Sequence, residues 1–200
     1  YGSSSINPSS GWDSFSETPF AVTVTCGTGD FNGTSDSEDF IRVGSVTNPS
    51  GAVACVGTAT TGTHTAYNNI VNMGIFAGPF SFGMYHAGAA LAYGKLALLM
   101  TYPTNPYSCV TKFSQWSNLM GDPALHLWTG PPSDFAPEYN LDVPDGINYL
   151  DILVLDTEGN IVPNAKVTAR GGGFFESTYS DEAGEATLVW ESANGSLNLS

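Results

Sequence analysis

The sequence predicts an α/β unit that is followed by a small all-β module. Two short apolar runs rich in β-branched residues, at 20–26 and 51–57, are typical of buried strands. Longer stretches at 68–76 and 83–100 have helical patterns, and the second is rich in alanine and leucine. Strands that alternate with helices favour a parallel sheet covered by helices. After residue 130 the pattern changes to short strands and turns, spaced as in a β-sandwich.

Two shorter elements complete the predicted α/β unit. Residues 37–43 predict a helix with Ser37 as its N-cap and acidic residues in its first turn. Residues 125–128 predict a last, short strand. The loop at 58–65, between the second strand and the first long helix, is polar and ends at His64.

A proline-rich segment at 130–137 divides the chain. We therefore expect a first domain over 1–130, a linker over 131–146 and an incomplete β-sandwich domain over 147–200. The strands expected in the second domain are 149–155, 165–169, 175–179, 186–191 and 197–199. These strands are too few to close a sandwich and the chain opens with Tyr1 instead of Met, so we expect sequence to be missing at both ends.

The composition excludes several classes of partner. The chain has 5 basic and 19 acidic residues and a formal net charge of -14, so nucleic acid and anionic membranes are poor partners. No run of about eighteen apolar residues predicts a membrane span. The acidity suits an extracellular protein, a salty medium or calcium binding. Asp36, Glu38 and Asp39 could bind a structural calcium ion, or they could occupy the solvated start of a helix; no other cofactor is expected.

Cys26 is the first candidate for chemistry. It ends the first predicted strand and is followed by Gly27 and Gly29. A nucleophile at the carboxyl end of a parallel strand lies where α/β sheets place their active sites, and the glycines would leave backbone N–H groups free for an oxyanion. The same pattern also fits a buried cysteine before a turn. Cys55, in the second strand, is expected to be inert core, whereas Cys109, in a predicted loop, is either free or paired elsewhere.

A thiol nucleophile needs a base, which is normally histidine. His64 is the best placed of the three histidines, because its loop follows the second strand at the same sheet edge as Cys26. A loop histidine that makes local hydrogen bonds is an equally good interpretation. His86, in a helical pattern, and His126, in a predicted strand, are typical of structural histidines.

Taken together and in order, four segments resemble the gingipain-like cysteine peptidase family. They are TCGTGDF at 25–31, SEDFIR at 37–42, PSGAVACVG at 49–57 and NLMGDPAL at 118–125. The resemblance extends over roughly residues 12–190 and implies a caspase-like α/β sheet followed by an immunoglobulin-like domain. It also implies that Cys26 is the nucleophile, that its backbone N–H helps to form the oxyanion hole, and that His64 is a candidate substrate contact.

The family's catalytic base is a histidine in a Gly-His-Gly motif that precedes the cysteine. In this chain the corresponding position falls at or before Tyr1, and Tyr1-Gly2-Ser3 contains no histidine. Either the histidine lies upstream, or the ancestral site has decayed. The acidic residue that sets specificity in the best-known members would also lie upstream.

Three functions follow from these observations. The first is an extracellular or cell-surface endopeptidase that cleaves polypeptides through a Cys26 thiolate and an acyl-enzyme. The second is an inactive peptidase-like domain that serves as a structural, filament or adhesive surface protein, associating with itself or with the remainder of its own precursor. The third is a carbohydrate-binding module, suggested by the many aromatic residues.

Overall fold

The computed structural model describes residues 18–45, 47, 50–130, 134–140, 142–144, 147–171, 174–190 and 198–199. The chain forms two compact units that divide between Gly130 and Pro131. Each unit has a hydrophobic core of its own. Among the described residues, no helix has both the length and the apolar character needed to cross a membrane.

A mixed sheet forms the centre of the first unit. Its described strands are β1 (Phe20–Thr23), β2 (Ala54–Thr58) and β3 (Ser117–Met120), which lie side by side in that order. β1 runs parallel to β2, with Phe20 opposite Ala54, whereas β3 is antiparallel to β2, with Met120 opposite Cys55. The parallel pair and the helices around it confirm the α/β prediction.

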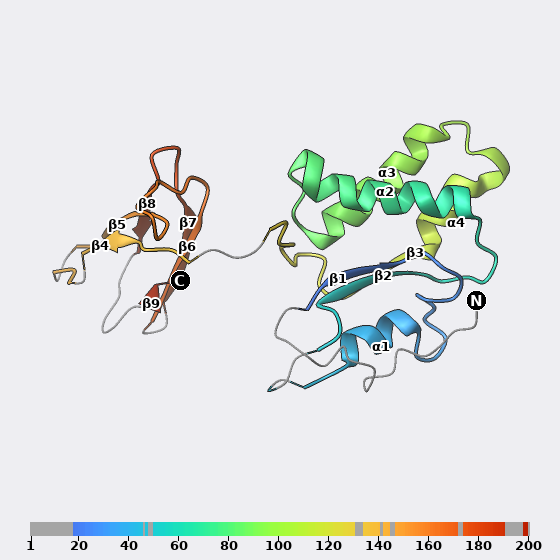
Figure 1. Cartoon of the computed structure of the whole chain (residues 1–200), viewed down its shortest axis with the longest axis horizontal. Coiled ribbons are helices and arrows are strands. Elements are labelled where there is room, and N and C mark those ends of the chain that lie inside the picture. Colours follow the sequence, from blue (N-terminus) through green and yellow to red (C-terminus); the bar gives the residue numbers. More distant parts are fainter. Residues whose placement is uncertain are drawn as a thin grey trace. The chain divides into compact units, whose positions relative to one another are not determined.

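Helices cover both faces of this sheet. They are α1 (Asp36–Arg42), α2 (Thr65–Phe82), α3 (Ala87–Thr101) and α4 (Cys109–Trp116), the last preceded by the short 3₁₀ turn η1 (Pro106–Ser108). In Figure 1, α1 lies on one face of the sheet and the other helices lie on the opposite face. Side chains of β2 alternate between the faces: Val56 packs with the α2–α4 layer, and Cys55 packs with Phe40 of α1.

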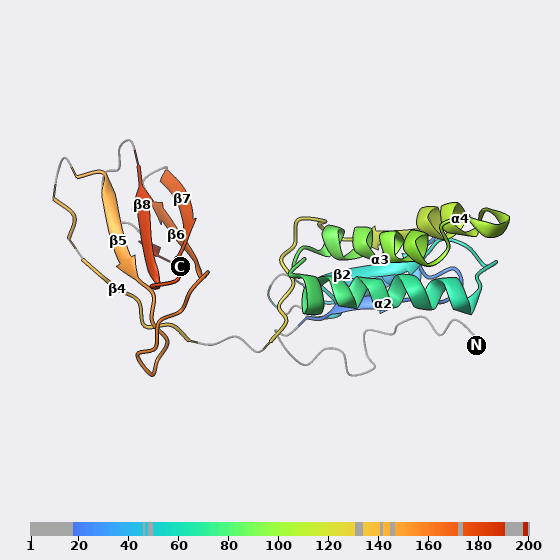
Figure 2. The ribbon, with the colours of Figure 1, turned by 90° about the horizontal axis from the view of Figure 1, so that it is seen from above.

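The helices α2 and α3 lie side by side above the sheet (Figure 2), and their backbones approach closely. A Cβ atom on Gly74 would lie 2.7 Å from the Cα of Gly94, and one on Gly94 would lie 2.6 Å from the carbonyl oxygen of Val71. These distances are shorter than any van der Waals contact, so the pairing requires glycine at both positions. Gly83, in the left-handed conformation with φ of 66°, ends α2 and lets the chain turn back.

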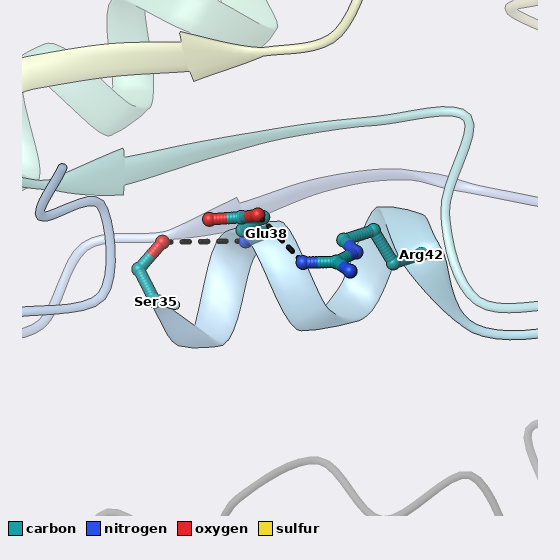
Figure 3. Close-up of polar contacts among 3 residues, drawn as sticks. All are labelled: Ser35, Glu38 and Arg42. Carbon is teal, nitrogen blue, oxygen red and sulfur yellow. Dashed lines mark hydrogen bonds and ion pairs between the residues drawn. The ribbon is translucent and has the colours of Figure 1, made fainter. Parts of the chain in front are cut away.

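The cap of α1 differs from the prediction. Ser35, and not Ser37, is the N-cap, because its Oγ accepts a hydrogen bond from the N–H of Glu38 at 3.3 Å. Glu38 also forms an ion pair with Arg42 at 2.8 Å (Figure 3). Ser37 is instead fully buried, with its Oγ 3.1 Å from the Oγ1 of Thr23. The N-cap therefore lies two residues earlier than expected, and the helix uses the Ser-x-x-Glu capping pattern at 35–38.

Other predicted bounds also change. The helix expected at 68–76 continues through Pro79 to Phe82, and the region around Cys109, expected to be a loop, forms α4. The strand expected at 125–128 does not form: His126 makes only an isolated bridge to His86. The place beside β2 is taken instead by β3, whose residues were not predicted to be a strand.

The second unit consists of two antiparallel sheets that share one core. Its described strands are β4 (Glu138–Tyr139), β5 (Tyr149–Leu153), β6 (Lys166–Gly171), β7 (Phe174–Tyr179), β8 (Glu185–Val189) and β9 (Asn198–Leu199). One sheet has the order β4-β5-β8 and the other β7-β6-β9. Alternate residues of β5, β6 and β8, such as Ile152, Ala169 and Leu188, point into the shared core. The positions of the predicted strands are confirmed for β5 to β8, whereas β4 was not anticipated.

Candidate active site around Cys26

Cys26 lies three residues beyond the end of β1, on an exposed turn. Gly27 has φ of 70°, which allows the chain to change direction immediately after the cysteine. The N–H of Gly27 donates to the carbonyl of Thr60 at 2.8 Å, and the N–H of Gly29 donates to the carbonyl of Thr58 at 3.1 Å. The cysteine turn is therefore tied to the segment that leaves β2, at the carboxyl edge of the parallel strands.

The buried side chain of Thr28 holds this turn from inside. Its Oγ1 lies 2.8 Å from the carbonyl of Thr23 and 3.0 Å from that of Thr25, either of which can accept its proton. The same oxygen accepts a hydrogen bond from the N–H of Thr58 at 3.2 Å. One buried hydroxyl thus joins the end of β1, the cysteine turn and the end of β2.

Two further contacts fix the turn against its neighbours. The side-chain amide of Asn68, buried in α2, donates to the carbonyl of Val24 at 3.0 Å. Gly29 lies against the backbone of Gly57, where an added Cβ would be 2.5 Å from the carbonyl carbon. Because backbone packs on backbone here, the position of Cys26 is set by rigid elements of the fold and not by a free loop.

The thiol of Cys26 has a polar partner in Thr63. The Sγ lies 2.9 Å from the Oγ1 of Thr63, and either atom can be the donor. Hydrogen bonds from the side chain and from the backbone of Thr63 lower the pKa of Cys26 below its ordinary value. Thr63 lies two residues before α2, so the sulfur also faces the N-terminal end of an 18-residue helix, which favours a negative charge.

The backbone donors near the sulfur are not those of the two glycines. The N–H groups of Gly27 and Gly29 are not free for an oxyanion, because both are hydrogen-bonded to the segment after β2. The backbone N–H groups that face the sulfur and lower its pKa are those of Thr63 and of Cys26 itself. The glycines therefore shape the turn, and their own N–H groups are not available to an oxyanion. The N–H of Cys26 is the donor that the family resemblance implies.

His64 lies next to Thr63 but is engaged elsewhere. It is the N-cap of α2, and its Nδ1 accepts a hydrogen bond from the N–H of Ala66 at 3.2 Å. This bond requires a lone pair on Nδ1, so in the neutral ring the proton is on Nε2. Its ring lies 5.3 Å from that of Tyr67. In the described part of the chain, no hydrogen bond joins His64 to Cys26.

His86 and His126 lie at the other end of α2. His86 is the N-cap residue of α3, and it forms an isolated antiparallel bridge with His126. The two rings are 5.6 Å apart, edge to face, and Tyr85 stacks on His126. An 18-residue helix is about 27 Å long, so neither histidine reaches Cys26 at the opposite end.

The other two cysteines have different surroundings. Cys55 is fully buried in β2, and burial raises the pKa of its thiol. Cys109 is the first residue of α4 and is partly buried; its hydrogen bond with Tyr67 raises the pKa of that tyrosine. All three cysteines lie in the described part of the chain and are free thiols. Cys26 therefore combines exposure with a lowered pKa, the combination that a nucleophile needs.

The acidic residues considered for calcium lie in the first turn of α1. There the carboxylate of Glu38 pairs with Arg42, and the helix N-terminus favours all three negative charges. Across the described ranges, no group of three or more His, Cys, Asp or Glu side chains is arranged to hold a metal ion. The arrangement favours the solvated helix start over the calcium alternative.

Sequence reasoning missed three residues of this site: Thr28, Thr63 and Asn68. The run between β2 and α2 contains threonine at 60, 61 and 63, and nothing in the pattern distinguishes the one that meets the sulfur. Asn68 is one of three asparagines in α2, and an asparagine in a helix is a weak signal, because many such residues satisfy local backbone groups.

The fold and the site together define a class of protein: an α/β unit that presents an exposed cysteine at the carboxyl edge of parallel strands. Residues 3–128 match the family model described as Peptidase family C25. The chain belongs to this family, which confirms its resemblance to the gingipains. No curated protein sequence shows a significant match to the chain.

Solved structures with the same fold include cysteine proteinases. A crystal structure of the Arg specific cysteine proteinase gingipain R has a TM-score of 0.69 and 16% identity, over 88% of this chain and 40% of that one. A complex of the pro- and mature domains of Porphyromonas gingivalis RgpB gives the same values. A structure described as a protease has a TM-score of 0.71 and 14% identity, over 92% of this chain and 44% of that one. This chain thus spans about two fifths of the length of these structures.

Proposed function

We propose that this chain carries the nucleophile of an exported cysteine endopeptidase. The observation that carries the proposal is the contact of 2.9 Å between the exposed thiol of Cys26 and Thr63. Together with the helix end behind it, this contact stabilises the thiolate relative to the thiol. Membership of a cysteine peptidase family gives that thiolate its proposed role.

The proposed reaction is acyl transfer to the cysteine. The Cys26 thiolate attacks the carbonyl carbon of a peptide bond, and the oxygen of the tetrahedral intermediate takes the negative charge. Collapse of the intermediate breaks the C–N bond, and a protonated histidine gives its proton to the departing amine. Water, deprotonated by the same histidine, then hydrolyses the thioester and regenerates the thiolate.

The finer parts of the proposal rest on the family resemblance. The base is a histidine that precedes the cysteine in the family's sequences, and Cys26 N–H is one oxyanion donor. His64, exposed beside Thr63, contacts the polypeptide substrate. We further propose that residues 1–130 belong to a caspase-like domain, that 147–200 belong to an immunoglobulin-like module, and that the protein acts outside the cell or at its surface. The expected linker 131–146 contains β4, which pairs with β5, so part of it belongs to the second unit.

The test is labelling of the natively isolated protein with a peptidyl chloromethyl ketone, which alkylates activated thiols. Wild type is compared with Cys26→Ala and with the matched control Cys109→Ala. We expect labelling to disappear in Cys26→Ala and to persist in Cys109→Ala. Labelling of Cys26 no faster than that of Cys109 would show that the thiol is not activated.

That second outcome would favour a structural role. The observation behind this alternative is that no histidine in the described residues contacts Cys26. An inactive peptidase-like domain would keep the structure of the Cys26 turn but would not hydrolyse peptide bonds. It would then serve as a surface, filament or adhesive component, and the native protein would show no hydrolysis of unfolded polypeptides.

A further inference from the structure

The outward face of the α2–α3 pair is apolar and exposed. We call it the outer helix face and define it by six side chains, three from each helix: Met73, Phe76, Phe80, Leu96, Leu99 and Met100. Between 41% and 70% of the surface of each is exposed. Exposed single apolar residues are ordinary, but six large apolar side chains exposed on two neighbouring helices indicate an interaction site.

The spacing of these residues places them on one side of each helix. In α2 they recur at intervals of three and four, as Met73, Phe76 and Phe80, the spacing of a helix–helix seam. The opposite side of α2 is apolar as well, because Val71 and Ile75 are buried in the core of the unit. A helix that is apolar on both sides is normally covered on both sides.

Charge distinguishes this face from the rest of the molecule. The whole chain has a net charge of -14, yet the segment 43–121 has no acidic residue and two lysines, Lys95 and Lys112. Lys95, which lies in α3, has its pKa lowered by partial burial. Two copies of this chain repel each other because both have a large negative net charge. The outer helix face lies in the segment without acidic residues, so contact through this face brings no carboxylates together.

The area of the face is close to what a stable pair needs. Side chains of this size have about 200 Å² of surface each, so the six together expose on the order of 600 Å². That is the upper end for the largest apolar patch of a monomer, and it approaches the roughly 800 Å² that each partner buries in a standard interface. The neighbouring exposed residues Asn69 and Ala92 widen it further.

We propose that the outer helix face binds a second copy of this chain. Each copy contributes the antiparallel pair α2 and α3, and the two pairs stack face to face as a four-helix layer. The contact is self-complementary, as two-fold symmetric pairs require. A second copy matches the face because it offers an equally uncharged apolar surface. An anionic membrane does not, because the remaining charge of the chain repels it.

The experiment is sedimentation velocity of the purified 200-residue chain over a range of concentrations. We expect a reversible dimer that tightens as salt is added, because salt screens the repulsion between the acidic copies. Phe80→Glu and Met73→Glu each place a charge on both sides of the contact and should weaken dimerisation about tenfold or more. Phe31→Glu is the matched control, because Phe31 is 69% exposed against 65% for Phe80 but lies outside these helices.

Circular dichroism of each variant keeps the test independent of folding, and labelling of Cys26 should be the same in all of them. A monomer at every concentration would overturn the proposal, as would a dimer weakened equally by Phe31→Glu and Phe80→Glu. Binding of the monomer to neutral phospholipid vesicles would assign the face to a membrane instead. Hydrogen exchange on a longer form of the natural protein tests an intramolecular contact. If the additional sequence protects the outer helix face in the monomer, the face belongs to that intramolecular contact.

Discussion

At the scale of single residues, the environment of Cys26 is governed by Thr63. The hydroxyl and the backbone N–H of Thr63 both stabilise the thiolate and lower the pKa of Cys26. The thiol itself is exposed, and desolvation opposes this effect less than either contact with Thr63 favours it. Activation of the thiol thus depends on one short polar contact and on the helix end behind it.

Thr63→Val should therefore raise the pKa of Cys26. With the hydroxyl gone, the thiolate loses a donor, and the pH profile of alkylation by iodoacetamide moves to higher pH. At pH values below the midpoint of that profile, the rate should fall severalfold. Thr63→Ser keeps the hydroxyl and should retain the profile of wild type.

Thr61→Val, in the same exposed loop, provides the control for the change of shape. Its profile should match that of wild type, because no hydrogen bond is assigned between Thr61 and the sulfur among the described residues. If Thr63→Val and Thr61→Val gave the same profile, the 2.9 Å contact would have no effect on the thiol.

At the scale of elements, α2 connects the site to the fold. The N-terminal end of α2 lies beside Cys26. The side chain of Asn68, in α2, donates a hydrogen bond to the carbonyl of Val24 before the cysteine turn, and the glycines of α2 pack on α3. His64 caps this end through its Nδ1. His64, which we propose to contact substrate, therefore also has a structural role as a helix cap. The effects of the two roles on labelling and on stability must be measured separately.

Two substitutions of His64 make this separation. His64→Ala removes the cap acceptor and should lower the free energy of unfolding by about 1 kcal/mol. His64→Asn keeps a side-chain acceptor at the N-cap and should stay close to wild type in urea-induced unfolding. If His64 also contacts substrate, both variants should lose peptide-probe labelling while alkylation by iodoacetamide is retained.

Labelling that follows stability, normal in His64→Asn and reduced in His64→Ala, would limit His64 to its role as a cap. In that case the substrate contacts come from other residues of the 58–65 loop or from outside the described chain.

At the scale of the whole molecule, the two units have separate cores. The core of the second unit is built from alternate residues of its strands, with Leu188 of β8 almost completely buried. The neighbouring Val189 points the other way and is 57% exposed. The two residues test the core and the surface of the same strand.

Leu188→Ala should destabilise the second unit by roughly 2–5 kcal/mol, because it leaves a cavity in the shared core. Val189→Ala should change the stability by well under 1 kcal/mol. Scanning calorimetry should show the transition of the second unit shifted in Leu188→Ala alone. Labelling of Cys26 should be unchanged in both variants, since the cysteine lies in the other unit; reduced labelling in Leu188→Ala would show that the two units unfold together.

The α/β class, the strands β5 to β8 of the second unit and the place of Cys26 near the end of a strand could all be predicted from local patterns. The strand itself, β1, is half-buried and not buried as expected. Hydrophobic periodicity and glycine positions are local signals, and they survive in the fold because burial of apolar side chains drives it. Where the local signal is ambiguous the prediction failed. Either of two serines, at 35 and 37, fits the N-cap of α1. Either of two segments, 117–120 and 125–128, fits a short strand beside β2.

The sequence by itself determined the family, the cysteine and its position at a sheet edge. The reason is that the order of the motifs and the pattern of apolar residues can be read directly from the sequence. The tertiary structure decided which hydroxyl meets the sulfur, which N–H groups are already occupied, and that His64 caps α2 while His86 and His126 lie at its far end. It also decided that α2 and α3 turn an apolar face outward. The reason is that hydrogen bonds, helix directions and exposure are set by contacts between residues far apart in the chain, whose pairing no local pattern specifies.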